Sequence, residues 1–126
     1  MKLALITGAT KGIGRETAIK FANSGWDLIL LARNIDKLTE LKNELLNTSS
    51  NIFTIACDLS LPENIQESLT QVIENCGCPS VLINNAGFAY NGDLIGMPLE
   101  KWQKIMQVNL TSVFQICSNI VPLMRK

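Results

Sequence analysis

Four short apolar runs are separated by longer segments in which apolar residues recur at helical spacing. The runs are Leu3–Thr7, Asp27–Ala32, Ile52–Cys57 and Ser80–Asn84. Short runs with almost no polar interruption are typical of strands that are buried on both faces. Their alternation with helical segments predicts a parallel sheet, because parallel neighbours need a connection long enough to hold a helix.

The segments between the runs are expected to be helices. They are Gly12–Asn23, Ile35–Leu46, Pro62 to about Glu74 and Pro98 to about Arg125, and a glycine-containing loop of residues 85–97 precedes the last. Pro62 suits a first helical turn, and Ser60 before it is a plausible N-cap. With right-handed crossovers, the strands take the order 3-2-1-4 in a Rossmann-like, doubly wound, three-layer α/β/α fold. One domain spans residues 1–126, with a ligand crevice at the carboxyl ends of the first and fourth strands.

Composition excludes several classes of function. Eleven basic residues balance eleven acidic ones, so no basic surface indicates a nucleic-acid partner. No apolar run approaches the roughly 18 residues of a membrane helix, and the first strand begins too early for a signal peptide. Four cysteines without CxxC spacing, and no histidine, argue against a metal site. We therefore expect a cytoplasmic protein with free thiols, no metal and no membrane partner.

The segment TGATKGIG, residues 7–14, joins the first strand to the first helix. Gly8 permits a tight turn, Gly12 lets a phosphate approach the backbone, and Gly14 lets the helix pack closely on the strand. The helix N-terminus directs free N–H groups and a positive dipole end at such a phosphate. The alternative is a glycine-rich turn that holds no ligand.

Ala32 ends the second strand and Arg33 follows it, at the place where NAD sites usually have an acid that accepts from the ribose hydroxyl. A guanidinium at this place pairs with a 2′-phosphate and can stack on adenine. Lys11 in the glycine turn adds a second positive charge. The pair favours NADP over NAD, unless both are simply solvated surface cations.

Polar residues also follow the third and fourth strands. Asp58 is placed to accept from an adenine amino group or to cap the next helix. In the sequence Asn84-Asn85-Ala86-Gly87, small residues leave room for a dinucleotide and an amide can bridge neighbouring strand ends, although an ordinary turn has the same composition. Asn109 interrupts the last helix, where asparagine is a poor helix former. It either holds a kink with water or faces solvent.

Taken in order, these features resemble the N-terminal half of a short-chain dehydrogenase/reductase over all 126 residues. The resemblance implies NADP(H)-dependent oxidation of a hydroxyl or reduction of a carbonyl in a small-molecule substrate. It implies that Gly8, Gly12, Ile13 and Gly14 line the pyrophosphate, that Lys11 and Arg33 select the 2′-phosphate, that Asp58 and Leu59 border adenine, and that Asn85, Ala86 and Gly87 border the ribose. It also implies that Asn109 is a catalytic residue that supports a proton relay through water.

The chain departs from the family in its acid/base residues. Family members use a tyrosine, a lysine four residues later and a serine, but the only tyrosine here is Tyr90 and the fourth residue beyond it is Leu94. We therefore expect a truncated, cofactor-binding half of the enzyme, inactive alone. The alternative is a non-catalytic NADP(H)-binding module or sensor that pairs with another chain. A methyltransferase-like nucleoside binder is disfavoured by Ala32 and Arg33.

The last helix is more apolar than one narrow face requires. In the family the matching helix packs against a partner subunit, and the resemblance therefore implies a homo-oligomer. The alternative is that further strands of the same chain cover part of this surface, and both can hold because one helix has several sides. The fourth strand is also expected to leave an exposed sheet edge, which favours association.

Overall fold

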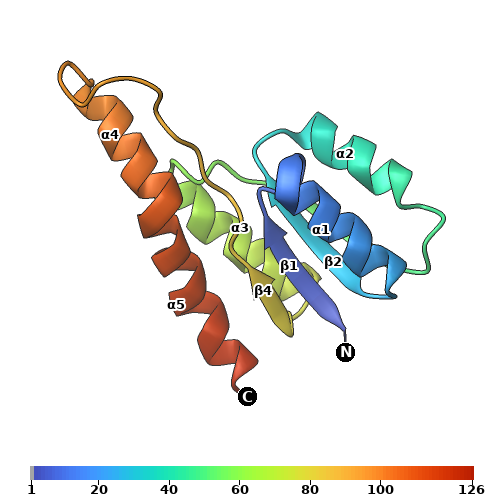
Figure 1. Ribbon diagram of the computed structural model, residues 1–126. Coiled ribbons are helices and arrows are strands. Elements are labelled where there is room, and N and C mark those ends of the chain that lie inside the picture. Colours follow the sequence, from blue (N-terminus) through green and yellow to red (C-terminus); the bar gives the residue numbers. More distant parts are fainter. Residues whose placement is uncertain (1) are drawn as a thin grey trace.

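The computed structural model describes residues 2–126 and contains a four-stranded sheet in the order β3-β2-β1-β4 (Figure 1). The strands are β1 (Leu3–Thr7), β2 (Asp27–Ala32), β3 (Ile52–Ala56) and β4 (Val81–Ile83). All neighbouring strands pair in parallel. The predicted strand order is confirmed, although β3 and β4 are shorter than the apolar runs that contain them.

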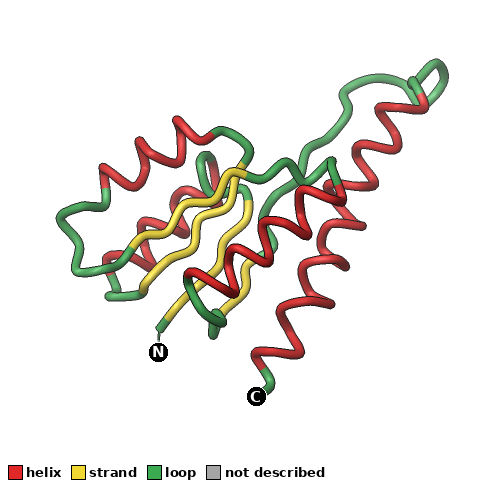
Figure 2. Tube along the Cα trace, turned by 180° about the vertical axis from the view of Figure 1, so that it is seen from behind, coloured by secondary structure: helices red, strands yellow, loops and turns green. Residues whose placement is uncertain are grey.

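Helices cover both faces of the sheet and complete three layers. Helices α1 (Gly12–Asn23) and α2 (Ile35–Glu44) lie on one face, and α3 (Pro62–Asn75) and α5 (Ser112–Met124) lie on the other (Figures 1 and 2). Successive strand residues point to opposite faces. Leu5 of β1 therefore shares a buried cluster with Leu69 of α3, whereas its neighbour Ile6 shares one with Ala18 of α1.

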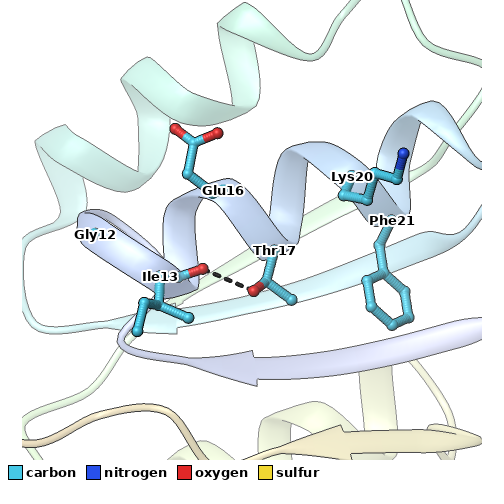
Figure 3. Close-up of a pocket in the computed structure, with 6 residues that line it drawn as sticks. All are labelled: Gly12, Ile13, Glu16, Thr17, Lys20 and Phe21. Atoms are coloured by element: carbon cyan, nitrogen blue, oxygen red, sulfur yellow. Dashed lines mark hydrogen bonds between the residues drawn. The ribbon is translucent and has the colours of Figure 1, made fainter.

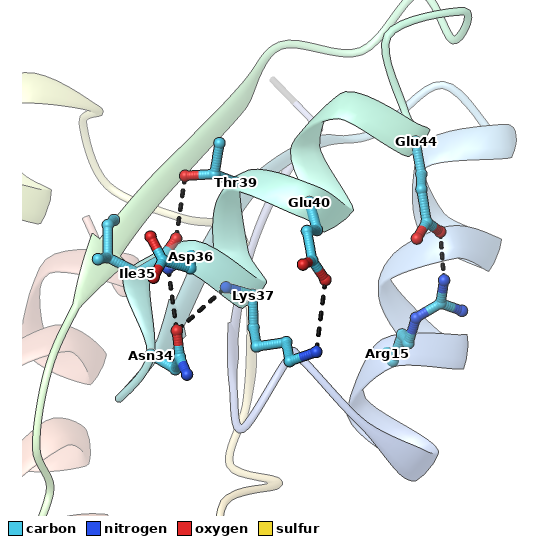
Figure 4. A network of polar contacts seen from close by, with 8 residues as sticks. All are labelled: Arg15, Asn34, Ile35, Asp36, Lys37, Thr39, Glu40 and Glu44. Atoms are coloured by element: carbon cyan, nitrogen blue, oxygen red, sulfur yellow. Dashed lines mark hydrogen bonds and ion pairs between the residues drawn. The ribbon is translucent and has the colours of Figure 1, made fainter.

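The start of α2 is fixed by a side-chain cap. Asn34 Oδ1 accepts hydrogen bonds from the backbone N–H groups of Asp36, at 3.0 Å, and Lys37, at 3.2 Å (Figure 4). At the other end of α2, Glu44 forms an ion pair with Arg15 of α1. Helix α2 ends at this residue, two positions before the predicted end at Leu46. The cap holds the backbone directly after Arg33, whose side chain is exposed.

The long last helix predicted from Pro98 to about Arg125 is continuous from Leu99 to Met124, but it is not α-helical throughout. Its first part, α4 (Leu99–Met106), follows the N-cap Pro98, and a π-helical segment, η1 (Gln107–Thr111), separates it from α5. A π segment carries an extra residue per turn and occurs frequently at functional sites. Between β4 and α4, residues 84–98 contain no helix or strand, close to the predicted loop. Figure 1 shows this connection running outward from the sheet to the start of α4.

Candidate functional site

The carboxyl ends of the four strands bring the candidate residues to one edge of the sheet. The glycine turn follows β1, Arg33 follows β2, Asp58 lies after β3, and Asn85 lies after β4. In a doubly wound sheet, ligands bind at this edge, where the connections to neighbouring strands diverge. The structure therefore places these residues, which come from distant parts of the chain, along one edge of the sheet.

Two of the three turn glycines are required by close contacts. A Cβ added to Gly8, whose φ is 61°, would lie 2.8 Å from the Cα of Ala86. A Cβ on Gly14 would lie 2.2 Å from the Gly8 carbonyl oxygen and 2.3 Å from Asn85 Nδ2. The predicted close packing at Gly14 is thus specifically a contact with the turn itself and with the loop after β4.

Gly12 has a different reason to be glycine. Its φ is 56°, in the left-handed region, and a Cβ there would meet nothing within 4 Å. Open space therefore lies beside the start of α1. The N-cap Lys11 makes no side-chain capping bond, and its carbonyl accepts from the N–H of Arg15 at 3.3 Å. The preceding N–H groups of α1, including that of the exposed Ile13, have no acceptor within the helix.

Thr7 and Asn85 lock the glycine turn to the loop after β4. Thr7 Oγ1 accepts from the backbone N–H groups of Asn85 and Ala86, each at 3.0 Å. Asn85 Nδ2 in turn donates to the carbonyl oxygens of Thr7, at 3.2 Å, and Gly8, at 3.1 Å. The predicted bridging amide is confirmed. Sequence reasoning missed Thr7, although a hydroxyl that ends an otherwise apolar run was a usable signal.

Asp58 does not cap α3, and neither does Ser60. The N-cap is Leu61, which makes no side-chain capping bond, so both capping interpretations were wrong. Instead, Asp58 Oδ1 accepts from the backbone N–H of Ser60 at 2.9 Å and from its hydroxyl at 2.7 Å. Asn64 of α3, which sequence reasoning missed, accepts from the N–H of Asp58 at 2.7 Å. These bonds give the loop after β3 a defined conformation.

The carboxylate of Asp58 is held in its charged form. The hydrogen bond from the Ser60 hydroxyl is the largest cause that lowers its pKa, and partial burial opposes it. The Ser60 amide and the charges of Arg33 and Lys104 lower the pKa further. An ionised Asp58 can accept a hydrogen bond, and the guanidinium of Arg33, after β2, lies near enough to lower the pKa of this carboxyl.

Asn109 holds the loop after β4. Its Oδ1 accepts from the backbone N–H of Phe88 at 2.9 Å, and its Nδ2 donates to the Phe88 carbonyl at 2.7 Å. A Cβ on Gly87 would lie 3.2 Å from Asn109 Oδ1. The side chain of Asn109, which lies in the π segment η1, thus bonds to the protein backbone, and neither expected alternative, a kink held with water or exposure to solvent, named this contact. Lys104 Nζ lies 5.9 Å from the centroid of the Phe88 ring, as a cation–π contact.

An open groove of about 660 Å³ runs along one side of α1. Figure 3 shows its lining residues, Gly12, Ile13, Glu16, Thr17, Lys20 and Phe21, on a single helix. The Thr17 hydroxyl donates to the Ile13 carbonyl at 2.7 Å, so it is satisfied within the helix. Only Gly12 and Ile13 belong to the candidate site. The groove therefore does not bring the strand-end residues together.

Two kinds of feature are absent from residues 2–126, a cluster of metal ligands and a membrane-spanning helix. In this range no three His, Cys, Asp or Glu side chains gather closely enough to bind a metal ion. No helix within the same residues has the length and apolar character needed to span a bilayer.

Comparisons with known proteins point to one family. The family profile described as short chain dehydrogenase matches residues 2–126. An NADPH-dependent pterin aldehyde reductase of Arabidopsis thaliana is 32% identical over 124 residues, which are 98% of this chain and 51% of that protein. A mouse protein, dehydrogenase/reductase SDR family member 7B, is 32% identical over 126 residues, covering 97% of this chain and 39% of its own length.

Solved structures of the same kind superpose closely. L-sorbose reductase from Gluconobacter frateurii, complexed with NADPH and L-sorbose, gives a TM-score of 0.92 at 31% identity, with 98% of this chain and 48% of that chain covered. An alcohol dehydrogenase from Thermococcus sibiricus, complexed with 5-hydroxy-NADP, gives 0.93 at 32% identity, with coverage of 99% and 54%. The chain thus spans about half the length of most of these relatives.

Proposed function

The chain belongs to the short-chain dehydrogenase family, and we propose that it is the NADP(H)-binding half of an oxidoreductase that interconverts a hydroxyl and a carbonyl group. When bound, the dinucleotide would supply the hydride donor or acceptor. The observation that carries the proposal is that the glycine turn, Arg33 and Asp58 follow the carboxyl ends of three neighbouring strands, β1, β2 and β3. The NADP(H) complexes of two structural relatives support the same cofactor class.

The turn fits a pyrophosphate. The space beside Gly12 is free of protein atoms, because an added Cβ there would touch nothing within 4 Å. The N–H groups at the start of α1, including that of Ile13, have no helical acceptor and can donate to phosphate oxygens. Gly8 and Gly14 maintain the shape of the turn. In this proposal, Asn85, Ala86 and Gly87 border the ribose.

The adenosine end favours NADP over NAD. Ala32 stands where an acid would repel a 2′-phosphate, and the exposed Arg33 and Lys11 supply positive charge. Asp58 offers an ionised oxygen to the adenine amino group, and Leu59 is buried beside it. We therefore propose that Arg33 and Lys11 bind the 2′-phosphate, and that Asp58 and Leu59 border adenine.

An Arg33→Asp variant tests the cofactor assignment. We expect wild-type protein to bind NADPH more tightly than NADH, and Arg33→Asp to lose about 10–100-fold in NADPH affinity, because a charge-assisted bond is replaced by repulsion. Affinity for NADH should change far less. Isothermal titration calorimetry measures both. Arg125→Asp, at an exposed position after α5, makes the same charge change away from the crevice and should leave NADPH affinity unchanged. An unaltered preference in Arg33→Asp would contradict the assignment.

The chain is proposed to bind the cofactor without turning over substrate by itself. Asn109 is the one proposed catalytic residue, and the only tyrosine, Tyr90, lacks a lysine four residues later. The second candidate, an NADP(H)-binding module that pairs with another chain, is favoured by this same lack. Calorimetry should detect NADPH binding by the pure chain, whereas an activity assay should detect no carbonyl-dependent oxidation of NADPH. Substrate-dependent oxidation of NADPH by the pure chain would contradict both the proposal that the chain is inactive alone and the proposal of a non-catalytic module.

The cellular setting is part of the proposal. All four cysteines are free, and a reducing cytoplasm is the compartment that fits them. The partners we propose are the dinucleotide, a small carbonyl or alcohol substrate in a full-length form, and further copies of the same chain.

A further inference from the structure

The π segment contacts the loops after β3 and β4. Gln107 Nε2 donates to the carbonyl oxygen of Leu59 at 3.3 Å and to Gln115 Oε1 at 2.9 Å. Two residues later, Asn109 holds the backbone of Phe88. Side chains two positions apart lie on nearly opposite sides of a helix, since each residue turns it by about 100°. One short segment therefore contacts both the loop after β3 and the loop after β4.

The contact made by Gln107 lies at the adenine end of the proposed site. Leu59 is buried, with its side chain in the cluster formed with α3 and α5, and its carbonyl oxygen receives the Gln107 amide. The next residue towards the N-terminus is Asp58, whose carboxylate is already oriented by Ser60. Gln107 thus anchors the one peptide carbonyl that directly follows the proposed adenine ligand.

Gln115 keeps this anchor in position. Its Oε1, one turn into α5, accepts from Gln107 Nε2, so the amide group of Gln107 is held from two sides. Both bonds are partly buried, where an amide hydrogen bond competes less with water. We propose that Gln107 is a positioning residue that holds the Asp58–Leu59 backbone in the conformation that receives adenine. This inference rests on the proposed NADP(H) function.

The test measures binding of the adenine-bearing half of the cofactor separately. The probe is adenosine 2′,5′-bisphosphate, titrated by calorimetry into the 126-residue protein and its Gln107→Met variant. Methionine preserves the length of the side chain and removes the donor. We expect about three- to ten-fold weaker binding, since one net hydrogen bond to the loop is lost. Gln103→Met, at an exposed position on α4, is the matched control and should bind like wild type.

A second readout separates positioning from general destabilisation. Reduced nicotinamide mononucleotide, which lacks adenine, should bind wild type and Gln107→Met equally, and amide exchange at Ser60 and Leu61 should be faster in the variant. If Gln107→Met does not fold, Gln107→Glu is used in the same titrations, because an ionised carboxylate cannot donate a hydrogen bond to the Leu59 carbonyl. Gln103→Glu is then the control that carries the same added negative charge at an exposed position.

Two outcomes overturn the inference and are distinguishable. Equal binding of adenosine 2′,5′-bisphosphate by wild type and the Gln107 variant would overturn the positioning role and leave the proposed function standing. No binding by wild type would overturn the proposed function, and the positioning role with it.

Discussion

The glycines of the turn after β1 have different physical roles, although the sequence pattern treats them alike. Gly12 needs its left-handed φ of 56° and leaves open space, whereas Gly14 is needed because the Gly8 carbonyl and the Asn85 amide lie within 2.3 Å of where its Cβ would be. The sequence alone predicted that glycine is needed at all three positions of the turn. The reason at Gly14 could not, because it depends on a loop far along the chain, after β4.

Substitution of alanine at these two positions should separate the two roles. Gly14→Ala should lower the free energy of unfolding by about 1–3 kcal/mol or more, because the added Cβ displaces backbone and a bonded amide. Gly12→Ala should cost about 1–2 kcal/mol, from its positive φ alone. Urea unfolding at neutral pH measures both. Gly25→Ala, with φ 79° and nothing within 4 Å, is the control for Gly12. A Gly14→Ala protein as stable as wild type would contradict the close approach of the Gly8 carbonyl and the Asn85 amide.

At the scale of elements, the π segment η1 is the feature that sequence reasoning reached only in part. Asn109 left two interpretations open, a kink held with water or exposure to solvent, because asparagine has poor helical propensity. The pattern of apolar residues nevertheless predicted one continuous helix, since both α4 and α5 preserve helical spacing on either side of η1. The bonds that Asn109 makes to Phe88 depend on the tertiary fold, and no local signal identifies their partner.

Asn109→Leu should release the loop after β4. It removes both bonds to the Phe88 backbone while filling a similar volume. We expect hydrogen exchange at the Phe88 amide to become at least about ten-fold faster. Loss of the two bonds should lower the free energy of the opening that exposes this amide by at least about 1 kcal/mol. Hydrogen-exchange NMR measures it. Asn119→Leu, which loses a bond only to Gln115 within α5, should leave Phe88 exchange unchanged. Unchanged exchange in Asn109→Leu would show that other contacts hold the loop.

At the scale of the whole molecule, the strand order and three-layer fold could be predicted because apolar runs, crossover lengths and handedness act over the entire chain. Most of the candidate residues, among them Gly12, Arg33, Asp58 and Asn85, gather at the predicted edge for the same reason. The hydrogen bonds that connect the loops could not be predicted from sequence. Thr7, Asn64 and Gln107 bond to backbone groups whose positions are defined only by the assembled fold.

Two surfaces that favour association are left uncovered within residues 2–126, an unpaired strand edge and an apolar stripe. The strand β4 pairs only with β1, so its outer edge is unpaired within residues 2–126. Along η1 and α5, large apolar side chains are exposed at Leu110 (60%), Phe114 (71%) and Val121 (40%). Their spacing of four and seven residues places them on one side of the helix. A stripe of this kind favours association with a second copy, which would bury it in both.

Self-association through this stripe is therefore expected, and Phe114→Asp should weaken it. The ring is exposed in the single chain, so the variant should fold normally, while the dimer loses apolar burial on both copies and gains two unpaired charges. We expect the dimer dissociation constant to rise at least about ten-fold. Sedimentation velocity over a concentration series measures it. Ile95→Asp is the matched control, since this side chain is 93% exposed in the loop before α4 and lies outside the stripe. Equal weakening of the dimer by both variants would show that the loop before α4 also belongs to the interface. A wild type that is monomeric at every concentration would contradict self-association.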